Sequence, residues 1–381
     1  MHTCSLVCLL LLAVAATAAP KAHELTPHYA FGQYLADFKK SYPSPVEHAK
    51  REKLFAQSLE DVLAHNSRPS SYKKGINRFS DWTEDELAAI RGGRVEPKYE
   101  PKYASVFKSS GKPVAAEVDF RKSYPPILTA VKDQGQCGDC WAHAVTEAVE
   151  SAYAIATGQL FVLSQQQVTS CTPTAGSCHG CEGSFPTLAY DYLVDNAITE
   201  EWIYPFEAYG NSDFNCSAFS DATPVNTIVN ISGYMLVGPN DQSATVQALN
   251  ELGPLSILAD ASSWSSYESG IFDGCSYADN ITLDHAIMVI GYGTENGTDY
   301  WTVRNSWAPS WGELGYIRLA KPKEAHCGWN TGAAHASYDC YGDGPAAVWS
   351  CGMCGILFGP AFPNVVVPTN APPWSASAGY S

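Results

Sequence analysis

The chain has 381 residues, which is too long for one ordinary hydrophobic core, so two or more structural units are expected. Its formal net charge of −16 is unevenly divided: residues 19–116 hold 16 basic and 12 acidic residues, and residues 117–381 hold 7 and 27. An acidic body repels phosphate groups, which excludes nucleic acid as a partner. A basic front segment ahead of an acidic one predicts that the two bind each other, although two independently solvated surfaces would give the same numbers.

The first 18 residues have the pattern of a secretory signal peptide. An apolar run from Leu6 to Ala16 leads into Ala16-Thr17-Ala18, the small residues of a cleavage site. The run is too short to span a bilayer, and no later stretch approaches about 20 apolar residues, so no membrane span is expected. Export also agrees with the possible N-glycosylation acceptors, each a weak signal alone, at Asn215, Asn230, Asn280 and Asn296.

Export makes the cysteine count informative. Of the 13 cysteines, Cys4 and Cys8 leave with the signal, so 11 remain in the exported chain. In an oxidising compartment an even number of these can pair, which leaves one free thiol or one half of an intermolecular bridge. The odd cysteine therefore needs an explanation of its own.

Residues 29–66 show a helical pattern that is interrupted once, at Tyr42-Pro43-Ser44-Pro45, and two helices are predicted. On the second, steps of three and four residues connect Glu47, Arg51, Phe55, Ser58, Val62 and Asn66. The motif Gly75-Ile-Asn77-Arg-Phe79-Ser-Asp81 follows it. Residues 92–116 are rich in Lys, Pro and Ser and are expected to form an extended linker.

Cys140 stands directly ahead of another helical pattern, in the stretch Gln134-Gly-Gln-Cys-Gly-Asp-Cys-Trp141. Apolar residues recur at helical steps from Trp141 to Ile155, and Gly158 supplies a stop. A thiol at a helix N-terminus lies among unpaired N–H groups at the positive end of the helix dipole, and both favour the reactive thiolate. Taken alone, Cys140 could equally be one half of a disulfide.

These motifs together resemble the papain-like cysteine proteases of the cathepsin L-like branch. The second helix and the Gly75–Asp81 motif are similar to the signatures of the family's propeptide, with Ser58 and Val62 as departures, and Gln134–Trp141 is similar to the motif of the nucleophilic cysteine. The resemblance covers roughly residues 29–336. It implies an α+β, papain-like two-lobed fold, with a helical lobe and an antiparallel β-barrel-like lobe, preceded by a helical prodomain. The linker is then expected to cross the cleft between the lobes.

The resemblance assigns catalytic roles to four residues. Cys140 is the nucleophile, and Gln134 supplies a side-chain N–H to the oxyanion hole. His285, at the start of an apolar strand, takes the thiol proton, and Asn305 orients the His285 ring. Trp307 shields that hydrogen bond from water and borders the substrate. Neither a metal ion nor an organic cofactor is expected.

The resemblance also implies where the substrate binds. Gly183 and Ser184 take positions whose backbone contacts the substrate, and Ser184 replaces the family's usual Gly, so its Cβ could crowd the substrate or change φ and ψ. The second subsite is implied to consist of Phe185, Pro186, Leu258, Ala286 and Gly332. These residues are apolar or small, which predicts a preference for bulky apolar or aromatic side chains there. The short span between Cys181 and Cys216 leaves no room for the occluding loop of cathepsin B-like dipeptidases, which favours an endopeptidase.

The family's disulfide pairing, carried over by position, implies Cys137–Cys181, Cys171–Cys216 and Cys275–Cys327. The remaining cysteines are Cys178, Cys340, Cys351 and Cys354, with three possible connectivities. The pairs Cys178-x-x-Cys181 and Cys351-x-x-Cys354 could also form a zinc site. Disulfides that attach the tail to the body fit an exported chain better.

Two residues near Cys140 depart from the family motif. Asp139 replaces Ser, and its carboxylate either opposes ionisation of the thiol or caps the helix. His143 replaces Phe one turn along the helix and is expected to be a neutral packed residue, with a second titrating group near the site as the alternative.

The predicted organisation is a signal peptide at 1–18, an inhibitory propeptide at 19–116, a catalytic domain at 117–337 and a C-terminal extension at 338–381, with the mature start between 109 and 117. The predicted function is that of a monomeric cysteine endopeptidase made as a zymogen. Its partners are protein and peptide substrates, its own propeptide as inhibitor, and cystatin-type inhibitors. It is expected in a lysosome-like compartment or outside the cell, with the propeptide loosened at ~pH 4–5. The alternatives are a catalytically silent papain-like binding protein and a secreted adhesive protein that works through its tail.

Overall fold

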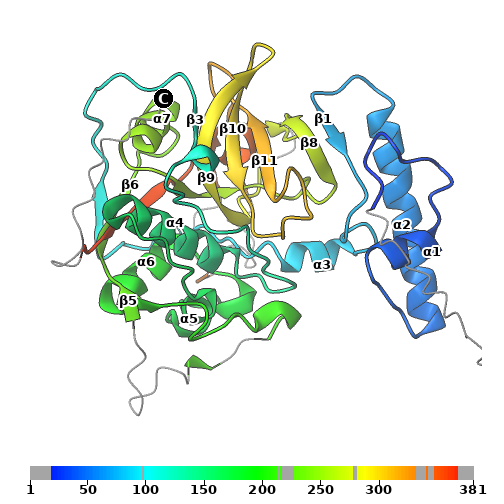
Figure 1. The fold of residues 1–381 in the computed structure, drawn as a ribbon, viewed down its shortest axis with the longest axis horizontal. Coiled ribbons are helices and arrows are strands. Elements are labelled where there is room, and N and C mark those ends of the chain that lie inside the picture. The colour runs from blue at the N-terminus through cyan, green and yellow to red at the C-terminus, as the bar shows by residue number, and fades with distance from the viewer. Residues whose placement is uncertain are drawn as a thin grey trace, which may run out of the picture.

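The computed structural model describes residues 19–96, 98–212, 215–216, 227–277, 281–331, 340–341 and 347–367. It shows a body in which helices lie beside a sheet, and a smaller helical unit at one end of the molecule (Figure 1). The expected signal peptide, Gly332 and residues 368–381 lie outside the described ranges. No helix within those ranges is both long and apolar enough to cross a membrane.

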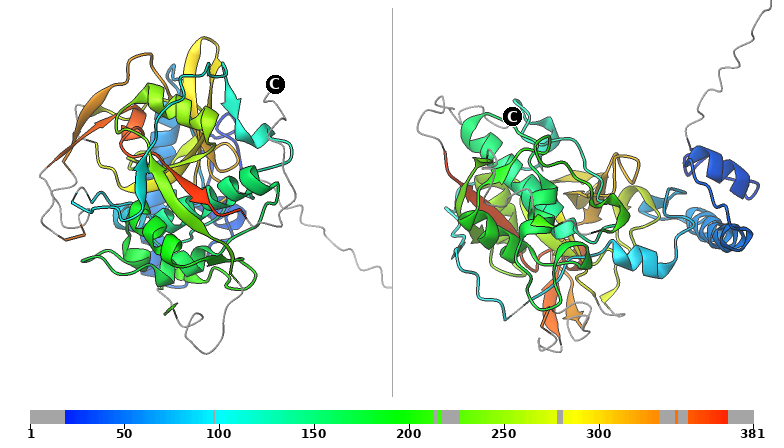
Figure 2. Two further views of the ribbon diagram at one scale, coloured as in Figure 1. Left: turned by 90° about the vertical axis from the view of Figure 1, so that its left-hand side faces the viewer. Right: turned by 90° about the horizontal axis from the view of Figure 1, so that it is seen from below.

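We call residues 19–116 the prosegment and the residues that follow them the body. The smaller unit is formed by the front of the prosegment and has a core of its own (Figure 2). Ser44 caps its long helix by accepting the Glu47 N–H, and Pro45 takes the first helical position, where its missing N–H costs nothing. Apolar residues on one face of that helix pack against the short helix before it, as the two-helix prediction requires. The elements of this part are α1 (Phe31–Asp37), α2 (Pro45–Asn66), β1 (Tyr72–Lys74) and α3 (Glu84–Ala89).

The Gly75–Asp81 motif ties this unit together and joins it to the body. Asp81 is fully buried and accepts a hydrogen bond from the Tyr34 hydroxyl at 3.0 Å. The Asn77 side chain donates to a backbone carbonyl of the body at 2.7 Å, and the Phe79 ring meets the Trp307 ring edge to face, with centroids 5.4 Å apart. The alternating polar and aromatic residues of the motif therefore contact two different partners, the prosegment helices and the body.

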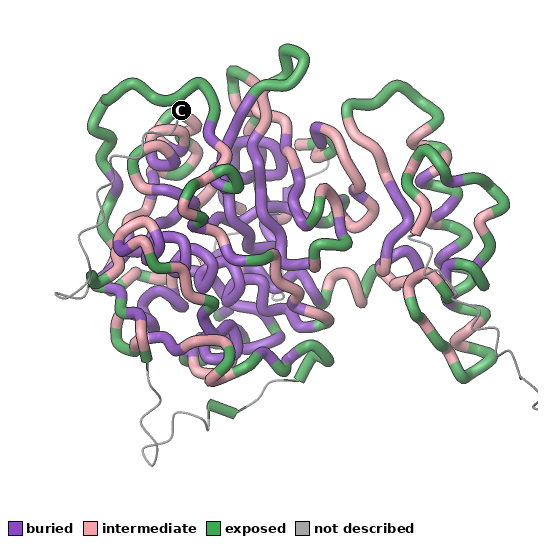
Figure 3. Tube along the Cα trace, in the orientation of Figure 1, coloured by how far each residue is buried: buried purple, intermediate pink, exposed green. Residues whose placement is uncertain are grey.

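The helical layer of the body is organised around α4 (Cys140–Thr157). It lies between the sheet on one side and α5 (Gln165–Cys171) and α6 (Pro186–Asp195) on the other, so almost every side chain of α4 is buried (Figure 3). The helix ends at Gly158, whose φ of 74° is a left-handed conformation that glycine adopts without strain. The helix predicted after Cys140 is confirmed, including its stop. A fourth helix, α7 (Gln242–Glu251), packs against β9.

A ten-stranded sheet forms the second layer, in the order β1-β8-β11-β10-β9-β7-β14-β6-β2, with β3 paired to β9. Both ends of this path, β1 and β2, come from the prosegment, which therefore extends the sheet on both edges. The apolar strand predicted at His285 is β9, and the structure places it, buried, at the centre of the sheet. The bounds are β2 (Ala104–Val106), β3 (Val118–Asp119), β6 (Ile231–Leu236), β7 (Leu255–Ala259), β8 (Tyr267–Phe272), β9 (His285–Glu295), β10 (Thr298–Arg304), β11 (Tyr316–Ala320) and β14 (Ala361–Val365), and β4 (Ile198–Thr199) pairs separately with β5 (Thr227–Val229).

The chain beyond residue 337, the expected C-terminal extension, packs into this architecture. β14 pairs with β6 and with β7 inside the main sheet. β13 (Val348–Cys351) pairs with β12 (Cys327–Asn330) as a separate two-stranded sheet. A short strand that fills a gap between two others is specified by its neighbours, so its own five residues carried too little pattern to reveal it.

The structure contains the implied disulfides Cys137–Cys181 and Cys171–Cys216, but the implied Cys275–Cys327 bond is wrong. Cys327 lies opposite Cys351 in the β12–β13 pair and bonds to it. Cys275 bonds instead to Cys354. The new bonds are Cys327–Cys351, Cys275–Cys354 and Cys178–Cys340. Because every cysteine of the possible zinc motifs is in a disulfide, the zinc alternative is also wrong.

Candidate active site

Cys140 is the first residue of α4 and lies against the start of β9. Its side chain is fully buried, and among the described residues it is the one cysteine outside a disulfide. The backbone N–H of Ala286, the second residue of β9, points at its Sγ with a nitrogen–sulfur distance of 3.4 Å. The two layers thus bring the odd thiol to the end of the histidine strand.

His285, the first residue of β9, is oriented by Asn305, which follows the neighbouring strand β10. Its Nε2 lies 2.8 Å from Oδ1 of Asn305, and the same oxygen accepts the Ser306 N–H at 2.8 Å. Because this oxygen only accepts, Nε2 carries the ring proton and Nδ1 keeps its lone pair. Nδ1 has no hydrogen-bond partner among the described residues. The Trp307 ring covers the imidazole, with centroids 4.8 Å apart.

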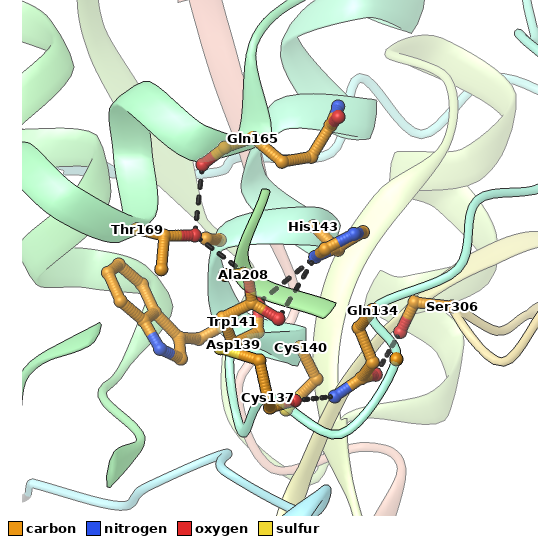
Figure 4. Close-up of polar contacts among 12 residues, drawn as sticks. Gln134, Cys137, Asp139, Cys140, Trp141, His143, Gln165, Thr169, Ala208 and Ser306 are labelled. Atoms are coloured by element: carbon orange, nitrogen blue, oxygen red, sulfur yellow. Dashed lines mark hydrogen bonds and ion pairs between the residues drawn. The ribbon is translucent and has the colours of Figure 1, made fainter. Parts of the chain in front are cut away.

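Gln134 has a fixed orientation beside the same site (Figure 4). Its Oε1 accepts the Ser306 hydroxyl at 2.6 Å, which turns Nε2 toward the residues before α4. Nε2 donates to the carbonyl of Cys137 at 2.7 Å and to the carbonyl of Ile90 at 2.8 Å. Ile90 belongs to the prosegment, so this side-chain N–H already binds a peptide carbonyl from outside the body.

The prosegment passes between the helical layer and the sheet directly after Ile90. The Ser184 N–H donates to the carbonyl of Gly92 at 2.9 Å, and the Gly93 N–H donates to the carbonyl of Asp284 at 2.8 Å. One wall of this passage is therefore the loop before α6 and the other is the residue before His285. The first residues of the predicted linker, Gly92 and Gly93, therefore pass through the cleft, as expected.

Only glycine fits at these positions of the prosegment. A Cβ on Gly92 would lie 1.6 Å from the carbonyl oxygen of Gly138, and one on Gly93 would lie 2.7 Å from the carbonyl carbon of His285. Neither neighbour can move away, because both are backbone atoms of the site itself. The backbone of the prosegment thus lies in direct contact with the segments that hold Cys140 and His285.

Covering the site leaves both reactive groups uncharged. Burial raises the pKa of Cys140 to about 12, despite the N–H of Ala286, which stabilises the thiolate. Burial lowers the pKa of His285 to about 3, despite the hydrogen bond to Asn305, which favours the protonated ring. At neutral pH the precursor therefore holds a thiol and a neutral imidazole, and the nucleophilic thiolate is scarce.

Asp139 does not cap α4, so that alternative is wrong: its side chain bonds no N–H of the first turn. Its Oδ2 accepts the Thr169 hydroxyl at 2.8 Å, and its Oδ1 lies 3.5 Å from Nδ1 of His143. His143 is buried, as expected, but it faces a carboxylate. Burial opposes a charge on its ring, but the charge and hydrogen bond of Asp139, together with the charge of Glu147, outweigh it, so the pKa of His143 lies above its ordinary value. The alternative of a second titrating group near the site fits the geometry better than a neutral packed residue.

Two of the implied second-subsite residues lie together beside Cys140. Leu258 and Ala286 stand opposite each other in the register of β7 and β9. They belong to the same buried apolar cluster as Cys140 and as Val95 of the prosegment. Gly332 was also expected here but lies outside the described residues.

The other implied substrate-binding residues lie on the opposite wall. Gly183 has a φ of 99°, a region that favours glycine, whereas Ser184 does not have a positive φ. The serine therefore strains no backbone where the family has glycine. Phe185 belongs to a separate small cluster and meets the prosegment ring of Tyr99 edge to face, with centroids 4.9 Å apart, and Pro186 begins α6.

Residues 90–94 of the prosegment fill the site. The predicted linker began at residue 92, but the sequence did not single out these residues as the ones in contact with the site. The adjacent Gly92 and Gly93 were an available signal, because paired glycines allow close approach of two backbones. Arg91 was not recognisable: its guanidinium pairs with Asp284 at 2.7 Å, across a separation in sequence that no local pattern spans.

Comparisons with known proteins agree with this arrangement. Residues 114–337 match the papain family cysteine protease domain, and residues 31–87 match the cathepsin propeptide inhibitor domain. Digestive cysteine proteinase 1 of Homarus americanus is 36% identical over 314 residues, covering 80% of this chain and 92% of that protein. A cathepsin L-like peptidase of Aedes aegypti is 33% identical over 349 residues, covering 86% and 98%. The structure of digestive procathepsin L 3 from the larval midgut of Tenebrio molitor superposes with a TM-score of 0.69 at 31% identity, covering 87% of this chain and 97% of that one.

The chain therefore belongs to the papain family of cysteine proteases. It is a cathepsin-like member made as a proenzyme, with an inhibitory propeptide ahead of the protease domain, and its homologues are cathepsin L-like proteases. Their mixed α+β fold with a helical prodomain is the one described above.

Gly92→Ala is expected to open the covered site of the precursor. The added Cβ overlaps the Gly138 carbonyl, and overpacking of this kind costs about 1–3 kcal/mol, which would raise the open fraction roughly 5- to 150-fold. The measurement is the rate at which a small epoxide thiol probe labels Cys140 of the intact precursor at pH 7, mapped by peptide mass spectrometry.

Gly32→Ala is the matched control for this experiment. Gly32 lies in α1, and a Cβ there meets no atom within 4 Å, so labelling should stay at the wild-type rate. Equal labelling rates for the two variants would show that the Gly92 passage does not control access to the thiol.

Proposed function

We propose that the mature chain hydrolyses peptide bonds with Cys140 as nucleophile, His285 as proton acceptor and donor, and Asn305 as the residue that orients the imidazole. The observation that carries the proposal is that the unpaired thiol of Cys140 lies at the start of the histidine strand. Its Sγ is 3.4 Å from the backbone nitrogen of Ala286, the residue after His285. A buried cysteine with a structural role would not need an oriented imidazole beside it.

In the proposed reaction, Nδ1 of His285 takes the thiol proton and the thiolate attacks the carbonyl carbon of the scissile bond. The tetrahedral intermediate collapses to a thioester, and the leaving amine takes the proton from His285. Water then attacks the thioester, with His285 again accepting a proton, and the acid product leaves as the thiol is restored. Support for the tautomer comes from the Asn305 bond, which holds the proton on Nε2.

Gln134 is proposed to stabilise the oxyanion of the tetrahedral intermediate. Its amide is oriented by the Ser306 hydroxyl, which donates to Oε1, and its Nε2 donates to a peptide carbonyl of the prosegment. A carbonyl is the type of group whose oxygen develops charge in the reaction. Loss of one such donor typically lowers the rate by ~10²–10³.

Epoxide labelling of the acid-treated protein tests the proposed function. Incubation at pH 4 and pH 7, followed by mass spectrometry, is expected to place the label on Cys140 together with loss of the residues before about 117. Cys140→Ala should abolish both labelling and peptide hydrolysis. A processed, folded protein that stays unlabelled would instead support a catalytically silent binding protein.

The proposed substrates are proteins and peptides with a bulky apolar or aromatic side chain in the second subsite, cleaved internally. Leu258 and Ala286 supply apolar surface beside Cys140, and the prosegment buries Val95 in the same cluster. Burial of a valine-sized side chain against such a surface favours binding by about 1.5–3 kcal/mol.

A peptide library tests this preference. Phe, Leu and Val are expected at the second position before the cleaved bond, and Leu258→Glu should shift the selection toward Arg, because a carboxylate is then buried beside that side chain. Leu258→Met is the control, since it changes the same side chain but keeps its surface apolar. Selection of Arg by the wild type would contradict the assignment.

Export through the secretory pathway, removal of residues 1–18 and action in an acidic compartment or outside the cell belong to the same proposal. The disulfides support it, because such bonds form and persist in oxidising compartments. Cystatin-type inhibitors are the proposed external partners, and they would compete with the prosegment for the same passage.

Acid is proposed to loosen the prosegment through its ion pairs with the body. Arg78 binds both oxygens of Asp133, at 2.6 and 2.7 Å. Burial raises the pKa of Asp133, but the hydrogen bonds and charge of Arg78, together with the Gly135 N–H, outweigh it, so the pKa lies below its ordinary value. A carboxylate of this kind stabilises the closed precursor above its ordinary pKa and loses that contribution as the pH falls through the lowered value. The loss therefore begins below about pH 4.

Asp284 acts in the opposite sense. Burial raises its pKa to about 7, against the attraction of Arg91, so this group favours the closed state in acid and opposes it as the pH rises through that value. The pH range in which acid loosens the prosegment consequently depends on carboxylates such as Asp133. This range lies below the ~pH 4–5 expected from ordinary carboxyl pKa values.

Arg78→Gln is expected to speed maturation at pH 5 and to flatten its pH dependence. Hydrogen bonds between charged groups contribute about 1.5–3 kcal/mol, and partial exposure of this pair reduces that to a several-fold change in rate. The measurement is precursor conversion on gels at pH 3.5, 5 and 7. Lys74→Gln removes the same charge from a pair with Asp61 inside the prosegment and should behave as wild type. An unchanged Arg78→Gln profile would exclude this ion pair as the acid-sensitive contact.

A further inference from the structure

Two residues that depart from the family motif near Cys140 are in contact with each other. Asp139 and His143 lie one turn apart around the start of α4, and Nδ1 of His143 is 3.5 Å from the Asp139 carboxylate (Figure 4). The same ring nitrogen lies 3.3 Å from the Asp139 carbonyl oxygen. The nucleophile Cys140 stands between the two residues in the chain.

Neither residue is open to water. Asp139 is 0% exposed and His143 is 1% exposed. The carboxylate has one further partner, the Thr169 hydroxyl of α5, and the edge of the imidazole faces the Phe206 ring. Removing one member of a buried ion pair leaves an uncompensated charge, which costs far more than the pair itself contributes. The two positions therefore have to be interpreted together.

The Asp139 carboxylate acts on the adjacent thiol. A negative charge beside Cys140 disfavours the thiolate, and Asp139 is among the groups that raise the pKa of Cys140, after burial. Asp139 belongs to the body, so this charge remains when the prosegment is lost. A neighbouring positive charge would cancel it.

The groups around His143 favour its protonated form. The charges of Asp139 beside it and of Glu147 on α4 act on its ring, as do those of Asp133 and Lys132 in the segment before α4. His143 also interacts through its charge with Glu201 in the loop after β4 and with His285 at the start of β9. Carboxylates dominate this set, so a proton on His143 is stabilised despite the burial of its ring.

We propose that His143 is a positioning residue that carries a proton in the mature enzyme and cancels the charge of Asp139 at Cys140. The inference rests on the proposed function of Cys140 as nucleophile. The pair keeps the thiolate accessible at the pH where the enzyme works, although its carboxylate alone would suppress it. The two sequence changes are then one compensated change.

The test measures the ionisation of Cys140 directly. Full-length protein is expressed, and the prosegment is removed in acid, with added pepsin where a variant does not process itself. The rate of alkylation of Cys140 by iodoacetamide is then followed from pH 3 to pH 10, because only the thiolate reacts. The variants are His143→Phe, Asp139→Ser and the double variant.

His143→Phe is expected to raise the apparent pKa of Cys140 by about one unit, which lowers the thiolate fraction about tenfold at any pH below it. Asp139→Ser should not raise it, and the double variant should return to the wild-type profile. The double variant is the matched control, because it contains the same phenylalanine without the carboxylate. A purely structural role of His143 would reduce the melting temperature without moving the alkylation profile.

Two results would overturn the inference: a His143→Phe profile identical to wild type, or a shift that persists in the double variant. If His143→Phe does not fold, His143→Gln removes the same charge and keeps a polar side chain for Asp139. Peptide hydrolysis is recorded in parallel. A wild type that alkylates with the expected shifts but hydrolyses nothing would contradict the proposed function and leave the charge compensation standing.

Discussion

The site depends on one contact between the two layers, the approach of the first turn of α4 to the start of β9. The N–H of Ala286 reaches Cys140 there, and His285 is the residue before it in the same strand. Asn305 follows β10, which pairs with β9, so the register of two adjacent strands sets the distance between the imidazole and the residue that orients it. If the pairing of β9 with β10 shifted by one residue, His285 would turn to the other face of the sheet, away from Asn305. The geometry of the site therefore depends on the register of these strands.

The precursor is closed by backbone more than by side chains. Gly92 and Gly93 allow the prosegment to lie against the segments that hold Cys140 and His285, where any Cβ would overlap backbone atoms. The consequence is electrostatic as well as steric, because burial disfavours both the thiolate and the imidazolium. The strands that the prosegment adds to both ends of the sheet hold it in place from outside the site. The prosegment therefore blocks access to the site and disfavours charge in it at the same time.

Buried charge on α4 follows one rule. Asp139 pairs with His143 of its own helix, Glu147 pairs with Arg304 of β10 at 3.0 Å, and Glu150 pairs with Lys132 of the preceding segment at 2.5 Å. A helix surrounded by protein cannot leave carboxylates to water, so each needs a cation from its surroundings. The pair nearest Cys140 differs from the others in that its cation is a histidine, the side chain whose ordinary pKa lies closest to physiological pH.

Local patterns in the sequence were sufficient for the prosegment helices, for the helix from Cys140 to its stop at Gly158, and for the strand that begins at His285, because these features depend on spacing and on motifs a few residues long. They were insufficient for the third disulfide and for the strand Ala361–Val365, which are decided by partners far away in the chain. The spacing of Asp139 and His143 permits a contact on a helix, but only packing against α5 and the sheet removes the water that would have screened it. The sequence by itself thus determined the kind of chemistry, since that depends on residue types in fixed local order. The tertiary structure decided which charges are compensated and how the site is closed, since both depend on burial.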